Sequence, residues 1–154
     1  MIRPSLPILY RIWYTTSVRK QSEPPQHGVV QSEKLENEGK RVPAIFYRTE
    51  AGGEPVREWI KRLSVEDRKR IGEDIKTVEF GWPVGMPVCK PMGEGIYEVR
   101  TSLGQNRIAR VFFYIDRKAR MVLLHGFIKK TQKTPDQDLD LARRNKNKHQ
   151  RGLQ

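Results

Sequence analysis

The sequence predicts an α+β fold, in which an N-terminal strand and a two-helix hairpin pack on a small antiparallel sheet and a C-terminal helix closes the chain. Two observations lead to this prediction. Apolar residues recur at helical spacing between residues 55 and 80, and three segments rich in β-branched and aromatic residues follow between residues 96 and 129. A chain of 154 residues has room for one core of ordinary size with flanking tails, but not for two full domains.

Residues 1–40 differ in composition from the rest of the chain. The stretch from Leu6 to Tyr14 is apolar but is interrupted by a proline and an arginine, and residues 21–40 are rich in Pro, Gln, Glu and Lys. Such a segment has little apolar surface to bury, so we expect either disorder or an extension that results from a misplaced start codon. A secretory signal is not indicated, because an uninterrupted apolar centre and a small-residue cleavage site are both missing. The folded domain is therefore expected to span residues 41–144.

The first folded elements are a strand over residues 42–48 and a helix that begins at Pro55. β-Branched and aromatic residues predict the strand, and two consecutive glycines mark the turn after it. Proline suits the first turn of a helix, where its missing N–H would have no helical partner. The core-facing stripe of this helix has the spacing i, i+3, i+4, i+7 and consists of Val56, Trp59, Ile60 and Leu63.

Ser64 begins a second helix, since Asp67 three positions later completes a pattern typical of a helix cap. Gly81 and Pro83 end this helix. The two helices form a hairpin whose joint apolar face needs a sheet to cover it. In the second helix that face consists of Ile71, Ile75 and Val78.

The sheet is predicted from three strands at residues 96–102, 107–116 and 121–129, with residues 88–92 at an edge. Short polar connections join the three strands, so successive strands should pair antiparallel as a meander.

Thr134, followed by a proline, predicts the start of a last helix, and Asp136 and Asp138 then lie at the positive end of its dipole. We expect the helix to fray after Arg144. Residues 145–154 would then form a basic, flexible tail.

The composition narrows the partners and the chemistry. Lys and Arg number 30 against 18 Asp and Glu, and the formal net charge of +12 indicates a polyanionic partner, either RNA, DNA or an acidic protein.

Cys89 is the only cysteine, so no intramolecular disulfide can form. A reducing cytoplasm is therefore the natural compartment, and we expect the thiol to be buried. The histidines, His27, His125 and His149, have no spacing that suggests zinc, so no metal is expected. No apolar run is long enough to cross a membrane.

Strand alternation places Glu98, Arg100 and Ser102 on one face of the first meander strand. This polar set is expected to face solvent or to line a cleft, while the alternate residues cover the helical hairpin. Arg110 lies within a largely apolar strand. Burying an unpaired guanidinium is costly, so Arg110 needs a carboxylate partner such as Glu98, or a groove that anions enter.

On the third strand, alternation places His125 and Lys129 on one face with Leu123 and Phe127, and Lys130 follows on the other side. A histidine in a strand is more often a hydrogen-bonded core residue than a catalyst, and a lysine cluster is usually a solvated strand end. The meander nevertheless brings a set of ionisable groups onto neighbouring strands, within reach of one phosphate. This set consists of Arg100, Arg110, His125 and Lys129.

Metal-free RNA cleavage needs a base for the 2′-OH proton, cations for the charge on the phosphate, and an acid for the leaving oxygen. Arginine suits the cationic task because its fork matches two phosphate oxygens. Lys129, Lys130 or a neutral His125 would serve as the base, and the spacing does not choose between them. Four aromatic side chains offer stacking surfaces for bases, although all but one are expected in the core: Trp82, Tyr97, Phe113 and Phe127.

Several segments between Val42 and Arg144 match a known group in sequence and not merely in pattern. They are "EPVREWIKRL", "DRKRIGEDIKTVEFGWPVGMP", "YEVRTSL", "RIARVFFYID" and "LLHGFIKKTQKTP". The region resembles the phage-derived, HigB-like branch of the RelE/ParE toxin superfamily. The resemblance implies a RelE-like fold and the toxin of a type II toxin–antitoxin system, an endoribonuclease that cleaves mRNA on the ribosome without a cofactor. It also implies a helix-turn-helix antitoxin as partner.

By the same resemblance, Arg100 in "YEVR" and Arg110 in "ARVFFY" correspond to arginines that relatives place on the scissile phosphate. Lys129 and Lys130 correspond to basic catalytic residues of RelE-like toxins. The chain departs from the family in two places, since no tyrosine follows "KKTQKTP" in the RelE manner and the histidine-rich ending of HigB toxins is missing. We expect further RNA contacts from Arg107, Lys133, Arg143 and Arg144.

ParE-type relatives share this scaffold and inhibit DNA gyrase, so the fold alone does not establish nuclease chemistry. The alternatives are a ParE-like gyrase inhibitor, a catalytically inactive prophage remnant that binds nucleic acid, and a basic RNA-binding module without activity.

Overall fold

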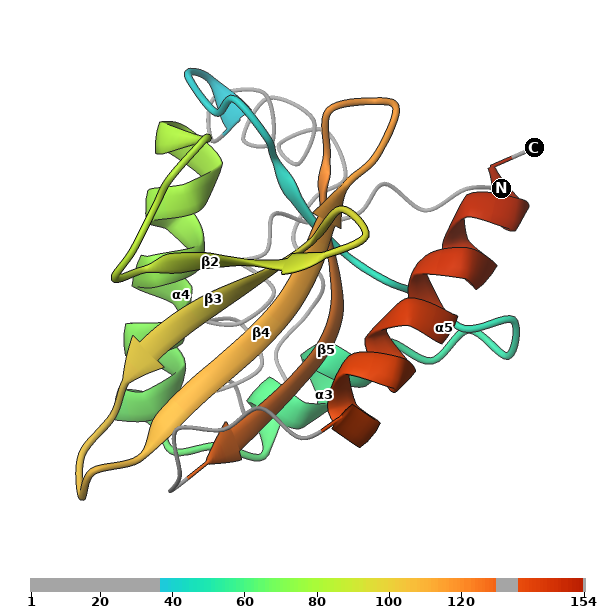
Figure 1. Cartoon of the computed structure of the whole chain (residues 1–154). Helices are drawn as coiled ribbons and strands as arrows, with labels where there is room; N and C mark the ends of the chain where they lie inside the picture. Colours follow the sequence, from blue (N-terminus) through green and yellow to red (C-terminus); the bar gives the residue numbers. More distant parts are fainter. Residues whose placement is uncertain (1–36, 130–135, 154) are drawn as a thin grey trace, which may run out of the picture.

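The computed structural model describes residues 37–129 and 136–153. Within them, a five-stranded sheet has the order β1-β5-β4-β3-β2 and packs against helices, which confirms the predicted α+β class (Figure 1). The strands are β1 (Ala44–Phe46), β2 (Cys89–Gly93), β3 (Ile96–Ser102), β4 (Ile108–Ile115) and β5 (Met121–Lys129), and the helices are α3 (Pro55–Lys61), α4 (Val65–Gly81) and α5 (Asp136–Gly152).

Strands β2 to β5 form the predicted antiparallel meander, and the edge strand expected at residues 88–92 is β2. The strand expected at residues 42–48 is shorter and joins the far edge, where β1 pairs with β5 in parallel. The chain between β1 and β5, which includes α3 and α4, makes the crossover that a parallel pair requires.

The two faces of the sheet pack against different helices. Figure 1 shows α3 and α4 on one side of the sheet and α5 on the other. The core under α3 and α4 includes Ile60, Ile75, Val99 and Phe113. The core under α5 includes Phe112, Tyr114, Leu124 and Ala142. Alternate residues of one strand therefore belong to different cores, as strand geometry requires.

The helical hairpin begins and ends as its sequence predicts. Pro55 occupies the first turn of α3, and the hydroxyl of Ser64 accepts a hydrogen bond from the backbone N–H of Asp67 at 3.2 Å. This contact satisfies an N–H that the first turn of α4 would otherwise leave without a partner. All residues of the predicted apolar stripes lie in or against the core under α3 and α4.

A β-bulge in β5 changes which side chains share a face. The register shifts between Phe112 and Phe113, which pair with His125 and Leu123. Leu123 consequently lies in the core under α3 and α4, whereas His125 lies opposite Phe112 on the α5 side. The prediction that Leu123 shares a face with His125 was wrong, because the bulge inserts one extra residue and inverts the alternation.

The last helix continues past Arg144, where the sequence analysis expected it to fray, and ends at Gly152. Tertiary contacts hold this second half. The side-chain amide of Asn145 donates to the carbonyl of Leu124 at 2.9 Å, and Nδ1 of His149 lies 2.5 Å from the hydroxyl of Tyr114. These contacts stabilise a sequence whose local signals favour fraying.

Some expectations concern residues outside the described ranges. The expected cap of α5 at Thr134 is one of them, as is the composition-based expectation for residues 1–36. At the start of the described chain, Lys40 forms an ion pair with buried Glu79 at 3.3 Å, so the folded part begins slightly before the predicted boundary. None of the described helices has the length and apolar character needed to span a membrane.

Candidate functional site

Two arginines lie side by side on adjacent strands of the sheet. Arg100 on β3 and Arg110 on β4 are directly paired in the antiparallel register. Strand alternation places both on the face that carries Phe112 and Tyr114, which is the α5 side. Phe127 on β5 pairs with Arg110 and extends the same row.

The carboxylate of Glu98 holds both guanidinium groups. Nη1 of Arg110 donates to Oε2 of Glu98 at 3.3 Å, and Nε of Arg100 lies 3.4 Å from Oε1. The expected partnership between Arg110 and Glu98 is confirmed. The expectation that Glu98 faces solvent or a cleft was wrong, because its side chain is fully buried between the neighbouring strands. The carboxylate of Glu98 thus contacts two cationic groups, one on its own strand and one on β4.

The two arginines differ in their access to solvent. The side chain of Arg110 is 2% exposed, whereas that of Arg100 is 21% exposed. A molecule in solvent can therefore contact the guanidinium of Arg100 but not that of Arg110. Arg110 is placed to fix Glu98, and Glu98 in turn orients Arg100 from below.

His125 and Asp138 form a second polar pair on the same side of the sheet. Nε2 of His125 lies 2.6 Å from Oδ1 of Asp138, in the first turn of α5, and both side chains are partly exposed. The imidazole ring stacks on Phe127, with ring centroids 5.6 Å apart and planes 22° apart. A carboxylate that holds one ring nitrogen fixes the orientation of the imidazole and leaves Nδ1 for another proton transfer.

The partnership between His125 and Asp138 was missed by the sequence analysis. Asp138 has an ordinary explanation there, as an acidic residue at the positive end of a helix dipole. The pair depends on how α5 returns over the sheet, and no local spacing signals that return.

Lys129, at the end of β5, adds a third cationic side chain to this face of the sheet. It pairs with Ile108 and shares the α5 side with Arg110 by alternation, and it is partly exposed. Lys130 and Lys133, which the sequence analysis also named, lie outside the described residues.

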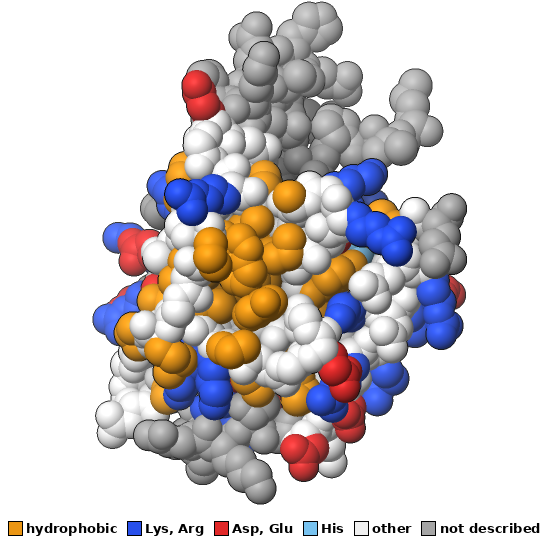
Figure 2. All heavy atoms as spheres, turned by 45° about the horizontal axis from the view of Figure 1, so that its top comes forward, with side chains coloured by type: hydrophobic (Ala, Val, Ile, Leu, Met, Phe, Trp, Pro, Cys, Tyr) orange, Lys and Arg blue, Asp and Glu red, His pale blue; other side chains and the backbone are white. Residues whose placement is uncertain are grey.

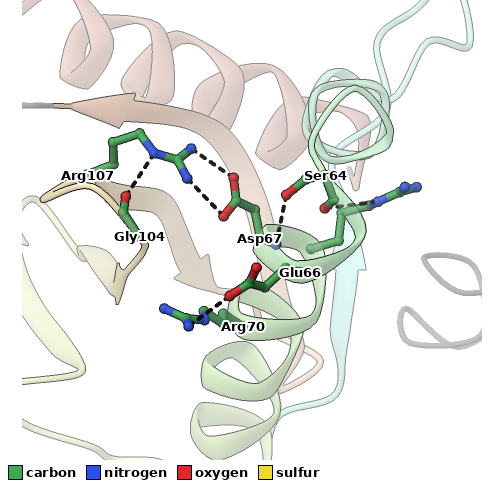
Figure 3. A network of polar contacts seen from close by, with 7 residues as sticks. Ser64, Glu66, Asp67, Arg70, Gly104 and Arg107 are labelled. Atoms are coloured by element: carbon green, nitrogen blue, oxygen red, sulfur yellow. Dashed lines mark hydrogen bonds and ion pairs between the residues drawn. The ribbon is translucent and has the colours of Figure 1, made fainter.

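Arg107 is engaged elsewhere. Its guanidinium forks onto the carboxylate of Asp67, with contacts of 2.8 and 3.2 Å, and Nε donates to the carbonyl of Gly104 at 3.0 Å (Figure 3). The hydrogen bonds to Asp67 raise the pKa of Arg107. The contacts join the β3–β4 turn to the first turn of α4, so Arg107 is not part of the row formed by Arg100 and Arg110.

Arg143 on α5 is also engaged elsewhere. Arg143 forms ion pairs with Glu94 at 3.1 Å and with Asp140 at 2.9 Å, which connects α5 to the β2–β3 turn. Lys146 donates to the backbone carbonyl of Glu94 at the same turn. Arg144 is exposed on α5.

The remaining candidates belong to the core or to no cluster. Burial raises the pKa of the Cys89 thiol to about 11, with a smaller contribution from the charge of Glu98, so the thiol is a buried apolar group as expected. The described part of the chain holds no group of His, Cys, Asp and Glu suited to a metal ion. Three of the four aromatic candidates contact one another at the core under α3 and α4, namely Trp82, Tyr97 and Phe113.

A mixed sheet with a helical hairpin on one face and a C-terminal helix on the other is consistent with the RelE-like fold. The phage-derived Gp49-like protein family (DUF891) matches residues 58–147, and the chain belongs to this family. The family is associated with the toxins of toxin–antitoxin systems. No curated protein is similar enough to the chain to count as a match.

Proposed function

We propose that the chain is the toxin of a type II toxin–antitoxin system, and that it cleaves mRNA on the ribosome without a metal or an organic cofactor. The observation that supports this most directly is a set of ionisable side chains on the α5 side of the sheet. There Arg100, held by buried Glu98, lies in register with Arg110 and on the same face as the His125–Asp138 pair. Family membership supports the toxin class, and the net charge of +12 supports a polyanionic substrate.

In the proposed reaction, Arg100 binds the non-bridging oxygens of the scissile phosphate. A base removes the 2′-OH proton, the 2′ oxygen attacks phosphorus, and the bond from phosphorus to the 5′ oxygen breaks. The first proton would go to Nδ1 of His125 or to the amine of Lys129, each acting in its neutral form, and a protonated group of the same set would give a proton to the 5′ oxygen. The negative charge that develops on phosphorus oxygens is stabilised by Arg100, whose position Glu98 fixes in advance.

A protein partner is supported by the surface. Figure 2 shows apolar side chains gathered on one face of the molecule, with Lys and Arg side chains around them. Exposed large apolar side chains among the described residues include Phe80 and Met86. Gathered apolar surface of this kind is often buried by another protein, which fits an antitoxin as the partner.

The test is to add the purified chain to a reconstituted translation system and to map the ends of a reporter mRNA. We expect cuts in the translated frame, and we expect Arg100→Ala to reduce the cleavage rate by about 10²- to 10³-fold, because it removes a preorganised cation from the phosphate. Arg117→Ala is the matched control, since Arg117 is exposed in the β4–β5 turn and lies away from the row.

Intact transcripts would overturn the proposal. Intact transcripts together with inhibited DNA supercoiling would favour the gyrase-inhibitor alternative. Salt-sensitive RNA binding without cleavage would favour a binding module or an inactive remnant.

A further inference from the structure

A groove of about 480 Å³ opens beside Arg100, along the edge of β3. Paired contact between β2 and β3 ends at Val99, and the backbone N–H of Arg100 makes one more bond, to the carbonyl of Val88 at 2.8 Å. Thr101 and Ser102 then line the groove instead of pairing with β2. The size of the groove is within the range of small-ligand sites in proteins.

One wall of the groove is apolar. It is formed by residues from the loop before β2 and from β4, and Met86 is a large apolar side chain that is 57% exposed there. Flat aromatic ligands bind well against such walls, because their faces lose water without losing hydrogen bonds. The apolar lining residues are Met86, Pro87, Val88 and Ile108.

The polar lining is divided by charge. Arg100 lines the groove from the sheet, and Glu73 and Asp74 line it from α4. Arg70 also lies there, but its guanidinium donates to Glu66 at 2.9 Å (Figure 3). A bound nucleotide would therefore direct its phosphate to Arg100, because the carboxylates of α4 repel a phosphate. Its base would lie toward Glu73 and Asp74.

Carboxylates only accept hydrogen bonds, so they discriminate between bases. Cytosine presents its N4 amino group as a donor, whereas uracil has the O4 acceptor at the same position. Adenine and guanine also present amino groups.

We propose that the groove binds the base next to the scissile phosphate, and that Glu73 and Asp74 select a base with an exocyclic amino group over uracil. This inference rests on the proposed mRNA cleavage and adds a substrate preference through a groove that shares Arg100 with the proposed site.

The test uses pairs of reporter mRNAs in the same translation system. The two members of a pair differ only by cytosine or uracil at one position, and each position around one mapped cut is tested in turn. At one of these positions the wild-type chain is expected to cut the cytosine reporter about tenfold faster than the uracil reporter. In the double variant Glu73→Gln, Asp74→Asn this ratio should fall toward one, because an amide both donates and accepts. Glu58→Gln is the matched control, an exposed carboxylate on α3 outside the groove, and it should leave the ratio unchanged.

The outcomes separate the two proposals. Cleavage by the wild-type chain at equal rates for cytosine and uracil at every position would overturn the inference about the groove and leave the proposed function standing. A preference that the double variant retains, with a thermal unfolding midpoint equal to that of the wild type, would also overturn it. Reporters that stay intact with the wild-type chain would overturn the proposed function and, with it, the inference.

Discussion

Glu98 on β3 accepts a hydrogen bond from Nη1 of Arg110 on β4 at 3.3 Å, and both side chains are buried within the sheet. The pair lies beneath Arg100, which contacts the other oxygen of the same carboxylate. The position of the partly exposed Arg100 therefore depends, through Glu98, on the buried Arg110.

Replacing Arg110 is expected to destabilise the fold. In Arg110→Met the carboxylate of Glu98 loses its buried partner, and the free energy of unfolding should fall by about 3–5 kcal/mol, nearer the lower value because Arg100 remains. Urea denaturation measures the change. The double variant Glu98→Leu, Arg110→Met should recover much of the loss, since it removes both members of the buried ion pair together. A single variant as stable as the wild type would contradict the importance of the pair.

Gly126 allows β5 to pass under α3. A Cβ atom at this position would lie 2.5 Å from two ring carbons of Trp59, which packs against the core. Gly126→Ala should therefore lower the free energy of unfolding by about 1–3 kcal/mol through overpacking. Gly104→Ala is the control, because a methyl group on Gly104 would meet nothing within 4 Å, and it should change stability by about 0.5 kcal/mol or less. Equal effects of the two variants would contradict the steric explanation.

The end of α5 is expected to loosen at acidic pH. Burial lowers the pKa of His149 below 6.5, with opposing influences from the charges of Asp116 and Arg120. The pKa of Tyr114 is raised to about 12, so its hydroxyl stays protonated, and it shares a hydrogen bond with Nδ1 of His149. The stability that this neutral histidine contributes is complete above pH 6.5 and is lost as the pH falls toward the lowered pKa of the folded state.

Thermal unfolding between pH 7.5 and 5.5 tests this dependence. The wild-type midpoint should fall on acidification, and the fall should be smaller in His149→Gln, which cannot take up the proton. Parallel curves for the two proteins would assign the pH dependence to other groups.

The thiol of Cys89 should be unreactive in the folded protein. It is 1% exposed and its pKa is raised to about 11, so both access and the thiolate fraction are low. Modification by a thiol reagent at pH 8 should be at least about 10³-fold slower than in the urea-unfolded chain. The reason is that the thiol can react only in the small fraction of molecules in which the fold has opened. Rapid modification without denaturant would show that β2 opens locally from the sheet edge.

Asp138 is expected to act through His125. In Asp138→Asn the carboxylate that contacts Nε2 of His125 is replaced by an amide, which no longer stabilises an imidazolium. The cleavage rate should therefore fall by about tenfold. His125→Ala should reduce the rate by about 10²-fold or more. Single-turnover cleavage rates separate the two effects, because Asp138→Asn should retain part of the cleavage that His125→Ala loses. An Asp138→Asn variant that cleaves as fast as the wild type would mean that the pair only attaches α5 to the sheet.

Local sequence signals were sufficient for most of the elements. The cap between Ser64 and Asp67, the apolar stripes of α3 and α4, and the limits of β3 and β5 follow from rules that act within one or two turns or along one strand. Regular strand alternation also placed Arg100 and Arg110 on one face once the antiparallel meander was inferred. These features depend on neighbours in the sequence, and the sequence determines them directly.

The tertiary structure decided the features that depend on distant partners. The bulge opposite Phe112, the length of α5 beyond Arg144 and the pairing of His125 with Asp138 each arise where segments far apart in the sequence meet. The difference in exposure between Arg100 and Arg110 has the same origin. A guanidinium has the same chemistry in both places, and only the packing of strands and α5 around it determines whether it contacts solvent or a buried carboxylate.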